Sequence, residues 1–482
     1  MCGARILVYS PFAIQRHFAK SSGMASVANC AAFGELAAMI RRFIRLLSGP
    51  VTKNYNKEDR QDVIPRPDHN ISRANISKAA LKVLYRLKDG GFQAYLVGGS
   101  VRDLLLNGQP KDFDVATDAT PEEVRAIFNN SRLIGRRFRL AHVRFGREII
   151  EVATFRAPAN EASDDHEVAE NSGRVLRDNV WGTFEDDVVR RDFTANALYY
   201  DIRDFSIRDQ VGGVADIRAR QLRLLGDPEQ RYREDPVRML RAARFAAKLD
   251  FQIEEATAAP IHDLGGLLQN IPPARLFDEF GKMFQAGYAE RTWHQLAHYG
   301  LIEHLFPPTA KWLAQDKDGL RMQFIEQALR NTDKRVVQDK PITPMFMFAV
   351  LLWGPVRELA NRYVQLDKMS DVQALVAAAA EMSAAQNARI AVPKRFTLPM
   401  REILQLQPRF NKRKGKRALS LLEHRRFRAA YDLMLLRVGL GEVDQETADW
   451  WTNIQEQPEH QNRQEVVEPV RKKRSRRRKR KQ

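Results

Sequence analysis

Asp112 and Asp114, two aspartates separated by a single residue, form the pattern in this sequence that most directly indicates chemistry. On a strand, side chains two residues apart point to the same face, so both carboxylates would face one way while Phe113 and Val115 face a core. Two converging carboxylates suit Mg²⁺, which is usually held by one or two carboxylates together with substrate phosphates. The spacing therefore predicts a divalent-cation site.

A glycine pair lies shortly before these aspartates, in residues 96–106, which read Leu-Val-Gly-Gly-Ser-Val-Arg-Asp-Leu-Leu-Leu. Because glycine has no Cβ, the backbone at Gly98 and Gly99 can approach a triphosphate closely, and the N-terminus of the following helix would point amide hydrogens at it. Ser100 could add a hydroxyl contact. A glycine pair alone is most often a simple turn, but its position beside the aspartates favours phosphate chemistry.

Two further carboxylates could complete the set. Glu151 lies inside the strand-forming residues 148–156, where an unpaired buried carboxylate is costly, so it is either a third metal ligand or an edge-strand glutamate that faces water. Asp192 could ligate metal, position a ribose or cap a helix over residues 194–200. The sequence does not choose between Glu151 and Asp192 as the third carboxylate.

An arginine-rich helix is predicted to start at Asp235, with Pro236 at its first position. Arg238, Arg241 and Arg244 follow at three-residue steps and so share one broad side of this helix. Guanidinium groups recognise phosphates and bond or stack on bases. The alternative is a solvated helix face on which Asp235 pairs with Arg238. Further basic runs occur at residues 411–417 and 424–428, and they suit either RNA or an exposed face.

The composition indicates a basic protein of several domains. The 482 residues are enough for two to four domains, and the 44% hydrophobic content fits a globular protein. The net charge is +18, of which ten positive charges lie in residues 471–481, so the rest of the chain is itself basic at about +8. Such a charge favours a polyanionic partner.

The cysteine content and the hydropathy of the sequence limit the cellular compartments and the kinds of site that are expected. Cys2 and Cys30 are the only cysteines and both lie in the first segment, so no disulfide framework or cysteine zinc site is expected. This fits a reducing compartment, and we expect the cytoplasm. The longest apolar run, residues 345–353, is too short to span a bilayer.

Hydrophobic periodicity divides the chain into an α+β part and a helical part. Helix and strand patterns alternate from residue 75 to about 213, interrupted by a polar segment, residues 157–178, that we interpret as a mobile loop. Successive helices are expected from 235 to 440. The predicted domains are a basic N-terminal extension (1–60), an α+β head (61–215), a neck (216–280), a helical body and tail (281–455) and a disordered basic tail (456–482).

The N-terminal extension carries a predicted basic amphipathic helix at residues 35–47. Such a helix can lie on an anionic membrane surface, which makes peripheral membrane contact a hypothesis, and an arginine-rich, acid-poor start can also be a transit peptide. A third reading is a misassigned start, because Met24 and Met39 could each initiate translation.

Five motifs in the same order resemble those of the class II nucleotidyltransferases, the family of bacterial poly(A) polymerases and tRNA CCA-adding enzymes. They are residues 96–103 (Leu-Val-Gly-Gly-Ser-Val-Arg-Asp), 111–115 (Lys-Asp-Phe-Asp-Val), 151–156 (Glu-Val-Ala-Thr-Phe-Arg), 190–194 (Arg-Arg-Asp-Phe-Thr) and 233–245 (Arg-Glu-Asp-Pro-Val-Arg-Met-Leu-Arg-Ala-Ala-Arg-Phe). The resemblance runs from about residue 71 to 440. Residues 133–143, the helical C-terminal part and the basic tail are more similar to the poly(A) polymerase branch.

The resemblance implies a polymerase-β-like head followed by all-α domains: a neck (216–280) that binds the nucleotide base and RNA, and a body and tail (281–455) that bind RNA. It implies a monomer that adds AMP from ATP to RNA 3′ ends without a template and releases pyrophosphate, in RNA processing and decay. Asp112 and Asp114 would hold two Mg²⁺ ions, with Glu151 or Asp192 as the further carboxylate. A tRNA CCA-adding enzyme is the nearer alternative, and a non-catalytic RNA-binding protein is the more distant one.

The same resemblance assigns the remaining site residues. Gly98, Gly99 and Arg102 would hold the phosphates, and Arg156 would make a phosphate or shaping contact. Asp235 and Arg238 match the family positions that hydrogen-bond the incoming base. Ser100 departs from the family pattern, in which a third glycine is common, and we expect this change to be tolerated. The N-terminal extension has no counterpart in the resemblance.

Overall fold

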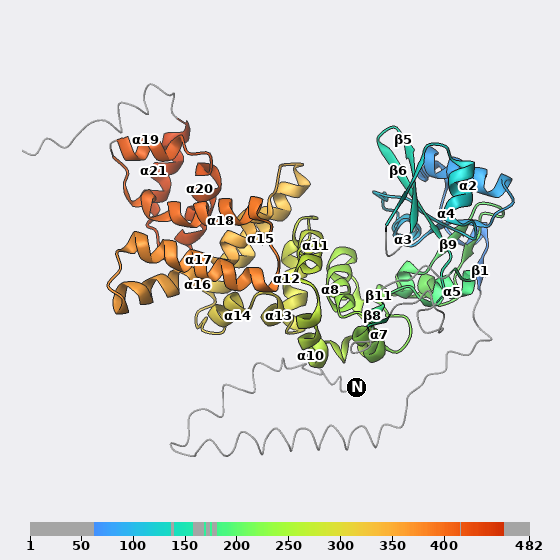
Figure 1. Ribbon diagram of the computed structural model, residues 1–482, viewed down its shortest axis with the longest axis horizontal. Coiled ribbons are helices and arrows are strands. Elements are labelled where there is room, and N and C mark those ends of the chain that lie inside the picture. The colour runs from blue at the N-terminus through green and yellow to red at the C-terminus, as the bar shows by residue number, and fades with distance from the viewer. Residues whose placement is uncertain are drawn as a thin grey trace, which may run out of the picture. The chain divides into compact units, whose positions relative to one another are not determined.

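The computed structural model describes residues 62–135, 139–157, 168–169, 174–175, 181–414 and 416–456 (Figure 1). The predictions for the N-terminal extension with its helix at 35–47, and for the basic tail from residue 457, lie outside these residues. Most of the polar segment predicted as a mobile loop lies outside them too, as does the centre of the 133–143 stretch. None of the helices in the described ranges is both long and apolar enough to cross a membrane.

An eight-stranded mixed sheet organises the first part of the described chain. Its strand order is β1 (Val63–Ile64), β10 (Ile207–Arg208), β9 (Tyr199–Asp201), β2 (Ala94–Val97), β3 (Asp114–Thr117), β6 (Glu148–Thr154), β5 (Leu140–Phe145) and β4 (Ser131–Ile134). All neighbouring strands are antiparallel except β3 and β6, which are parallel. This parallel pair is where the two strands that begin with carboxylate motifs meet.

Helices cover both faces of this sheet. On one face lie α2 (Lys78–Asp89) and α4 (Pro121–Ile127), and Figure 1 shows them beside β6. Ser77 caps α2 by accepting a hydrogen bond from the amide of Ala80, 3.0 Å away. On the other face α5 packs its Phe184 against strand aromatics. The remaining elements of this part are η3 (Arg66–Asp68), η4 (Arg73–Asn75), α3 (Gly99–Leu105), η5 (Thr194–Asn196), α5 (Phe184–Val189) and α6 (Gly213–Arg218).

Two sequence-based expectations for this part differ from the structure. The helix expected over residues 194–200 is only a 3-10 turn at Thr194–Asn196, followed by strand β9. Tyr199 and Tyr200 are fully buried, and β9 bonds to β2 on one side and β10 on the other, so sheet pairing overrides the local helical pattern. In the segment expected to be a loop, β7 (Val168–Ala169) and β8 (Arg174–Val175) form an antiparallel pair.

The rest of the described chain is helical, as the sequence predicted. A two-residue parallel pair, β11 (Gln221–Leu222) with β12 (Gln252–Ile253), is the exception. The helices are α7 (Pro228–Glu234), α8 (Val237–Leu249), α9 (Glu255–Ala258), α10 (Ile261–Leu264), η6 (Gly265–Asn270), α11 (Pro273–Phe284), α12 (Ala289–His298), α13 (Ile302–Leu305), α14 (Pro307–Leu313), α15 (Leu320–Val337), α16 (Pro344–Leu366), α17 (Asp371–Arg389), α18 (Lys394–Leu406), η7 (Gln407–Asn411), α19 (Lys416–Leu422), α20 (Phe427–Val438) and α21 (Gln445–Glu456).

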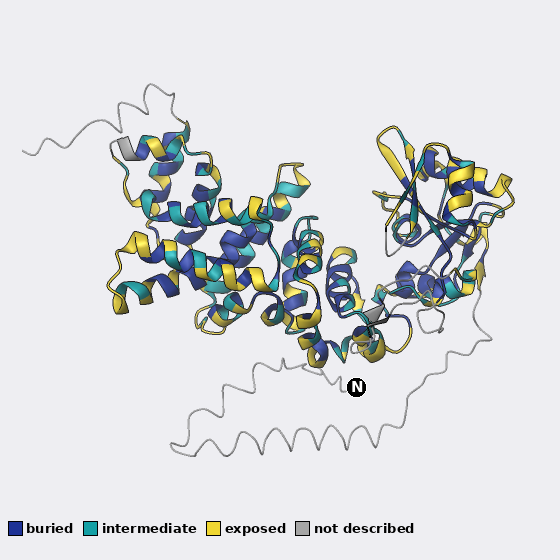
Figure 2. Ribbon diagram, in the orientation of Figure 1, coloured by how far each residue is buried: buried dark blue, intermediate teal, exposed yellow. Residues whose placement is uncertain are grey.

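A hydrophobic core runs through these helices and continues into the sheet (Figure 2). Helix α16 lies at its centre, because residues 347–356 of this helix are buried without interruption. The predicted domain boundaries after residues 215 and 280 each fall within a helix, α6 and α11 respectively. The α+β part followed by a helical part is confirmed, while the exact division into domains stays a prediction.

Candidate active site

Strand β3 places Asp114 at the edge where three strands meet. Asp114 is the first residue of β3, and its register partners are Val97 at the end of β2 and Glu151 in β6. Asp112 precedes the strand. Phe113 and Val115 are buried, so the alternation of carboxylate and apolar side chains that the sequence predicted is present. Glu151 thus reaches the neighbourhood of the aspartates through pairing of parallel strands.

The carboxylates at this edge of the sheet lie close enough for their negative charges to affect one another. The pKa of Asp114 is raised to about 6, first by loss of hydration, then by the neighbouring charges of Glu151 and Asp112, while Arg191 opposes the shift. Asp114 is nevertheless exposed to solvent, so its carboxylate lies at the surface rather than in the core. His142 Nε2 lies 3.3 Å from Glu151 Oε1 on the next strand.

The glycine turn between β2 and α3 has a backbone conformation that residues other than glycine rarely adopt. Gly98 has φ +69° and ψ −128°, a region essentially restricted to glycine. A Cβ at Gly98 would lie 3.3 Å from Nη1 of Arg191, and one at Gly99 would lie 3.4 Å from Nη2 of Arg102. Two guanidinium groups therefore flank the turn, one beside each glycine, and each is also paired with an aspartate, Arg191 with Asp187 and Arg102 with Asp103.

Two residues of this turn serve the fold itself. The hydroxyl of Ser100 is buried and donates to the carbonyl oxygen of Val97 at 2.9 Å, so the expected contact of this hydroxyl with a ligand is replaced by a contact that holds the turn. Arg102 is 2% exposed; it bonds to Asp103 at 2.6 Å and to Asn196. Arg102 thus supports the turn from beneath Gly99, and its contact with a phosphate stays a prediction.

Asp192 connects the sheet-bearing part to helix α8. Its Oδ2 accepts from Nε of Arg241 at 2.7 Å, and its Oδ1 accepts from the amide of Phe193 and the side chain of Asn196 at 2.8 and 3.1 Å. Although burial alone would raise the pKa of Asp192, the Arg241 guanidinium and these hydrogen bonds hold it below its usual value. Both oxygens of Asp192 are therefore engaged by protein groups, unlike those of Asp114.

Arg191 is a component of the site that the sequence analysis did not single out. Its guanidinium donates to Tyr199 at 2.6 Å and to Asp187 at 3.0 Å, and these contacts hold it beside Gly98. Tyr199 also donates to Asp187 at 2.8 Å. The only hint in the sequence was the doublet of arginines before Asp192, because nothing local indicates which guanidinium would face the glycine turn.

The residues expected to read the base lie at the junction of α7 and α8. Asp235 Oδ2 accepts from Nη2 of Arg275 at 2.7 Å. Arg238 Nη1 donates to Glu234 at 2.9 Å and to the carbonyl oxygen of Arg231 at 2.6 Å. The expected alternative pairing of Asp235 with Arg238 is therefore absent from the contacts of these described residues. Contact with an incoming base stays a prediction.

The other two arginines of α8 and Arg156 take different positions. Arg244 is buried and stacks its guanidinium over Phe245, 4.2 Å from the ring centroid, whereas Arg241 pairs with Asp192. The arginines that were expected to share one side of α8 therefore have different surroundings: Arg244 lies in the core, whereas Arg241 lies at the site. Arg156 is buried after β6 and donates to the carbonyl oxygen of Arg139 at 3.2 Å, which fits a shaping role, and its predicted phosphate contact has no support of its own.

The donor set at the β3 edge fits Mg²⁺. The raised pKa of Asp114 reflects negative charge that a divalent cation would neutralise, and carboxylate oxygens are the ligands that this cation prefers. Within the described ranges, no three side chains of histidine, cysteine, aspartate or glutamate converge closely enough to hold a metal by themselves. Phosphate oxygens of a nucleotide would therefore be needed to complete the coordination.

Three family models match separate parts of this chain. Residues 94–223 match the model for the poly A polymerase head domain, residues 250–313 the model for a probable RNA and SrmB-binding site of polymerase A, and residues 367–482 the model for the polymerase A arginine-rich C-terminus. Poly(A) polymerase I of Escherichia coli is 50% identical over 400 residues, which cover 82% of this chain and 85% of that protein. Poly(A) polymerase I of Haemophilus influenzae is 44% identical over 423 residues, covering 87% and 93%.

CCA-adding enzymes are similar over a smaller part of the sequence. The enzyme of Lactobacillus helveticus is 41% identical over 204 residues, which cover 42% of this chain and 49% of that protein. The structure of the Bacillus stearothermophilus CCA-adding enzyme in complex with CTP has a TM-score of 0.54 at 25% identity and covers 80% of this chain and 82% of that one. The head therefore has the nucleotidyltransferase fold, and the chain belongs to the bacterial poly(A) polymerase family.

Proposed function

We propose that this protein is a template-independent polynucleotide adenylyltransferase that adds AMP from ATP to RNA 3′ ends and releases pyrophosphate. The observation that carries this proposal is the identity of 50% with poly(A) polymerase I over 82% of the chain, compared with 41% over 42% for a CCA-adding enzyme. The sequence likeness to poly(A) polymerases therefore extends through the helical part, whereas the sequence likeness to this CCA-adding enzyme covers less than half of the chain, although the fold is shared over more of it.

The β3 edge would carry the chemistry. Asp112 and Asp114 face the triphosphate, and we assign Glu151 as the third carboxylate because it is in register with Asp114 and both oxygens of Asp192 are already engaged. Two Mg²⁺ ions held there would supply Lewis-acid stabilisation of the phosphates and activation of the RNA 3′-hydroxyl. Asp192 would position Arg241 and Asn196 and so connect the head to α8.

The glycine turn and the arginines around it would hold the triphosphate. Gly98 and Gly99 leave the backbone open to phosphate oxygens, and Arg191 presents positive charge beside them. Asp235 and Arg238 would contact the adenine base, with Arg275 fixing the Asp235 carboxylate. A guanidinium and a carboxylate on one helix junction can together meet the donor and acceptor groups of a base edge.

One assay separates this function from its alternatives. Purified protein with Mg²⁺ is given a generic RNA, or a tRNA that lacks its 3′ end, with ATP and CTP supplied separately. We expect long A-tails on the generic RNA with ATP only. A short C-C-A addition confined to the tRNA would instead support a CCA-adding enzyme, and inactivity with every nucleotide would support a non-catalytic RNA-binding protein.

A substitution at the proposed metal site tests the metal assignment separately from RNA binding. Asp112→Ala removes a carboxylate outside the strand core, so we expect incorporation to be abolished while RNA binding survives. Retained incorporation by this variant would refute the metal assignment.

The cellular setting follows as part of the same proposal. We place the protein in the cytoplasm as a monomer that acts in RNA polyadenylation, processing and decay. The basic helix predicted at residues 35–47, outside the described residues, would add peripheral membrane contact. Unchanged fractionation after deletion of this segment would refute the membrane contact and leave the catalytic proposal intact.

A further inference from the structure

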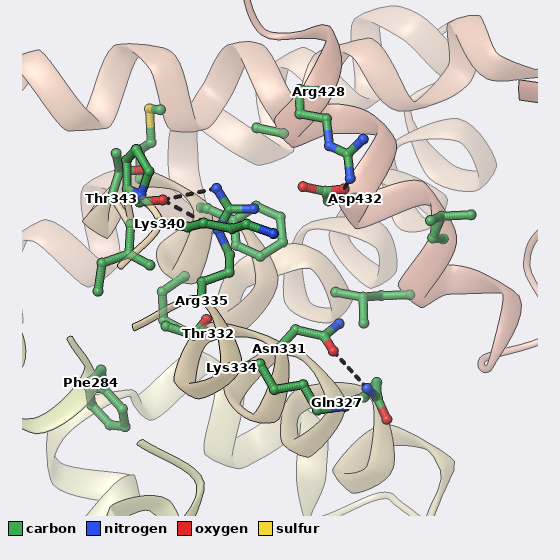
Figure 3. Close-up of a pocket in the computed structure, with 18 of the residues that line it drawn as sticks. Phe284, Gln327, Asn331, Thr332, Lys334, Arg335, Lys340, Thr343, Arg428 and Asp432 are labelled. Carbon is green, nitrogen blue, oxygen red and sulfur yellow. Dashed lines mark hydrogen bonds and ion pairs between the residues drawn. The ribbon is translucent and has the colours of Figure 1, made fainter. Parts of the chain in front are cut away.

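A pocket lies in the helical part, in a region to which the catalytic proposal assigns no role. It has a volume of about 840 Å³ and is formed by α15, the loop that follows it, the start of α16 and helix α20 with the residues before it. Figure 3 shows its two walls: Gln327, Asn331 and Lys334 come from α15, while Arg428 and Asp432 come from α20. A volume in this range holds a ligand of nucleotide size.

The charge of this pocket is strongly positive. Six cationic side chains contribute to its lining but only one carboxylate, that of Asp432. Asp432 is paired with Arg428 at 3.1 Å, and Arg425 and Arg426 both bond to Glu402, which lies outside the pocket. These three arginines share two carboxylates, so one of their three positive charges remains.

Three other cations lie outside ion-pair distance of any carboxylate in the described part of the chain, although the charge of Arg335 also acts on Asp432. Among the residues that the structure describes, Lys334, Arg335 and Lys340 form no ion pair with a carboxylate. Arg335 donates through Nε and Nη2 to the carbonyl oxygen of Pro341, at 3.3 and 3.0 Å, which fixes its direction without removing its charge. Figure 3 shows Arg335 and Lys340 between the two walls. An anion entering the pocket would meet these three groups first.

The rest of the lining suits a heterocyclic base. Phe346 and Met345 are only partly buried, and Leu320 and Leu435 are each 36% exposed, so the pocket lining offers apolar surface in addition to its cationic side chains. Aromatic and apolar side chains bind bases of any sequence by stacking. Gln327 donates to the side-chain oxygen of Asn331 at 2.9 Å. Within the described residues, the amide nitrogen of Asn331 therefore remains free to donate a hydrogen bond to a ligand.

We propose that this pocket binds one nucleotide of single-stranded RNA, upstream of the 3′ end that is extended; this inference rests on the proposed function. The phosphate lies against Lys334, Arg335 and Lys340, and the base stacks on the apolar surface beneath. A duplex does not fit, because its bases are stacked inside the helix, whereas single strands can place one base in a recess. The site gives the enzyme a hold on RNA that does not depend on the catalytic centre.

The first test measures equilibrium binding to the full chain without ATP, using a series of fluorescent oligoadenylates of increasing length. We expect Lys334→Gln/Lys340→Gln to weaken binding of the longer oligomers by about tenfold and to reduce the salt dependence of log K by up to about 0.7, since the two lysines meet one phosphate and each phosphate contact on a single strand contributes about 0.7. The control Lys317→Gln/Lys368→Gln removes two exposed lysines outside the pocket and should change affinity by less than about twofold.

The second test fills the pocket without changing its charge. Asn331→Trp places a large ring into the recess from an exposed helical position, so folding should be retained and affinity should fall by about fivefold or more. Circular dichroism melting checks the fold. An oligomer with abasic sites but the same phosphates should bind the wild type about as weakly as Asn331→Trp binds the intact RNA.

Several results would overturn the proposal. The nucleotide site would be refuted if the two double lysine variants bound RNA with equal affinity. It would also be refuted if the wild type bound abasic and intact RNA equally well, or if Asn331→Trp left the affinity unchanged. Free AMP that binds as tightly as RNA, with the same sensitivity to Lys334→Gln/Lys340→Gln, would identify a small-molecule effector site instead. Because no ATP is present, these outcomes are distinct from failure of the wild type to add AMP, which would refute the proposed function.

Discussion

Asp114 and Glu151 are register partners on β3 and β6, the one parallel strand pair in the described eight-stranded sheet. Their carboxylates come from motifs separated by a helix and two strands, and only the pairing of these strands brings them together. The consequence is a raised pKa for Asp114, because partial loss of hydration and the negative charge of Glu151 both disfavour the ionised form, although Asp114 is still exposed to solvent. This relationship supports two predictions about the site.

The first prediction concerns stability and pH. The pKa of Asp114 is about 6 in the folded protein and lies near its usual 3.8 when unfolded, so ionised Asp114 destabilises the metal-free fold above pH 6. The penalty decreases as the pH falls through 6 and is gone below 3.8. We expect Asp114→Asn to be more stable than the wild type at pH 8, by about 1 kcal/mol after allowance for solvent screening, and equally stable near pH 4. Urea denaturation in EDTA measures this, and a difference independent of pH would contradict it.

The second prediction separates Glu151 from Asp192. Glu151→Gln should lower kcat by about 100-fold or more with little change in stability, because its side chain is 48% exposed and supports charge at the site. Asp192→Asn should instead destabilise the fold by about 2–3 kcal/mol, since Arg241 loses its partner. Thermal denaturation and steady-state kinetics on both variants give the comparison. If Asp192→Asn is inactive but fully stable, Asp192 is the third carboxylate.

A third prediction concerns the base-reading residues. Arg275→Met keeps the apolar stem but removes the group that bonds Asp235 at 2.7 Å, so the Asp235 carboxylate loses its fixed direction. We expect the KM for ATP to rise about tenfold, with more CTP incorporated and a smaller effect on kcat. The control is Arg233→Met, which removes an exposed arginine that bonds only Glu229 among the described residues. Equal effects of the two variants would exclude a positioning role for Arg275.

A fourth prediction tests the helical core. A Cβ at Gly354 in α16 would lie 2.1 Å from Cε2 of Trp312, and overpacking of this kind costs about 1–3 kcal/mol. Gly354→Ala should therefore destabilise the protein even though alanine favours helix by about 1 kcal/mol. Gly281→Ala is the matched control in α11, where the nearest atom is 3.6 Å away, and it should stabilise. Chemical denaturation of both variants decides this, and two changes of the same sign would contradict it.

Local features of this protein could be predicted from the sequence because they depend on residues a few positions apart. The Gly98 turn requires a backbone conformation that glycine permits, and the alternation around Asp114 follows from the period of a strand. The cap at Ser77 and the succession of helices after residue 235 follow from the same local rules. These features indicated a phosphate and divalent-cation site, and the resemblance of five ordered motifs to a known family then indicated a nucleotidyltransferase.

Contacts between distant segments could not be predicted in this way. Ser100 and Arg102 belong to the phosphate motif, yet the fold uses the Ser100 hydroxyl to hold the turn and buries Arg102 under Gly99. The predicted helix around Tyr199 became a strand because β2 and β10 offer backbone partners on both sides. In each case the free energy of burial and of sheet pairing outweighed the local preference.

The sequence by itself determined which chemical groups the protein carries and their local order: two aspartates on one strand face, a glycine turn and a basic helical part. Only the tertiary structure decided which of them meet. Strand pairing brings Glu151 to Asp114, a partly buried ion pair joins Asp192 to Arg241, and helix packing gathers Lys334 and Lys340 around one pocket. The physical reason is that charge and hydrogen-bonding capacity are properties of single residues, whereas pKa shifts, ion pairs and cavities arise from distances between segments far apart in the chain.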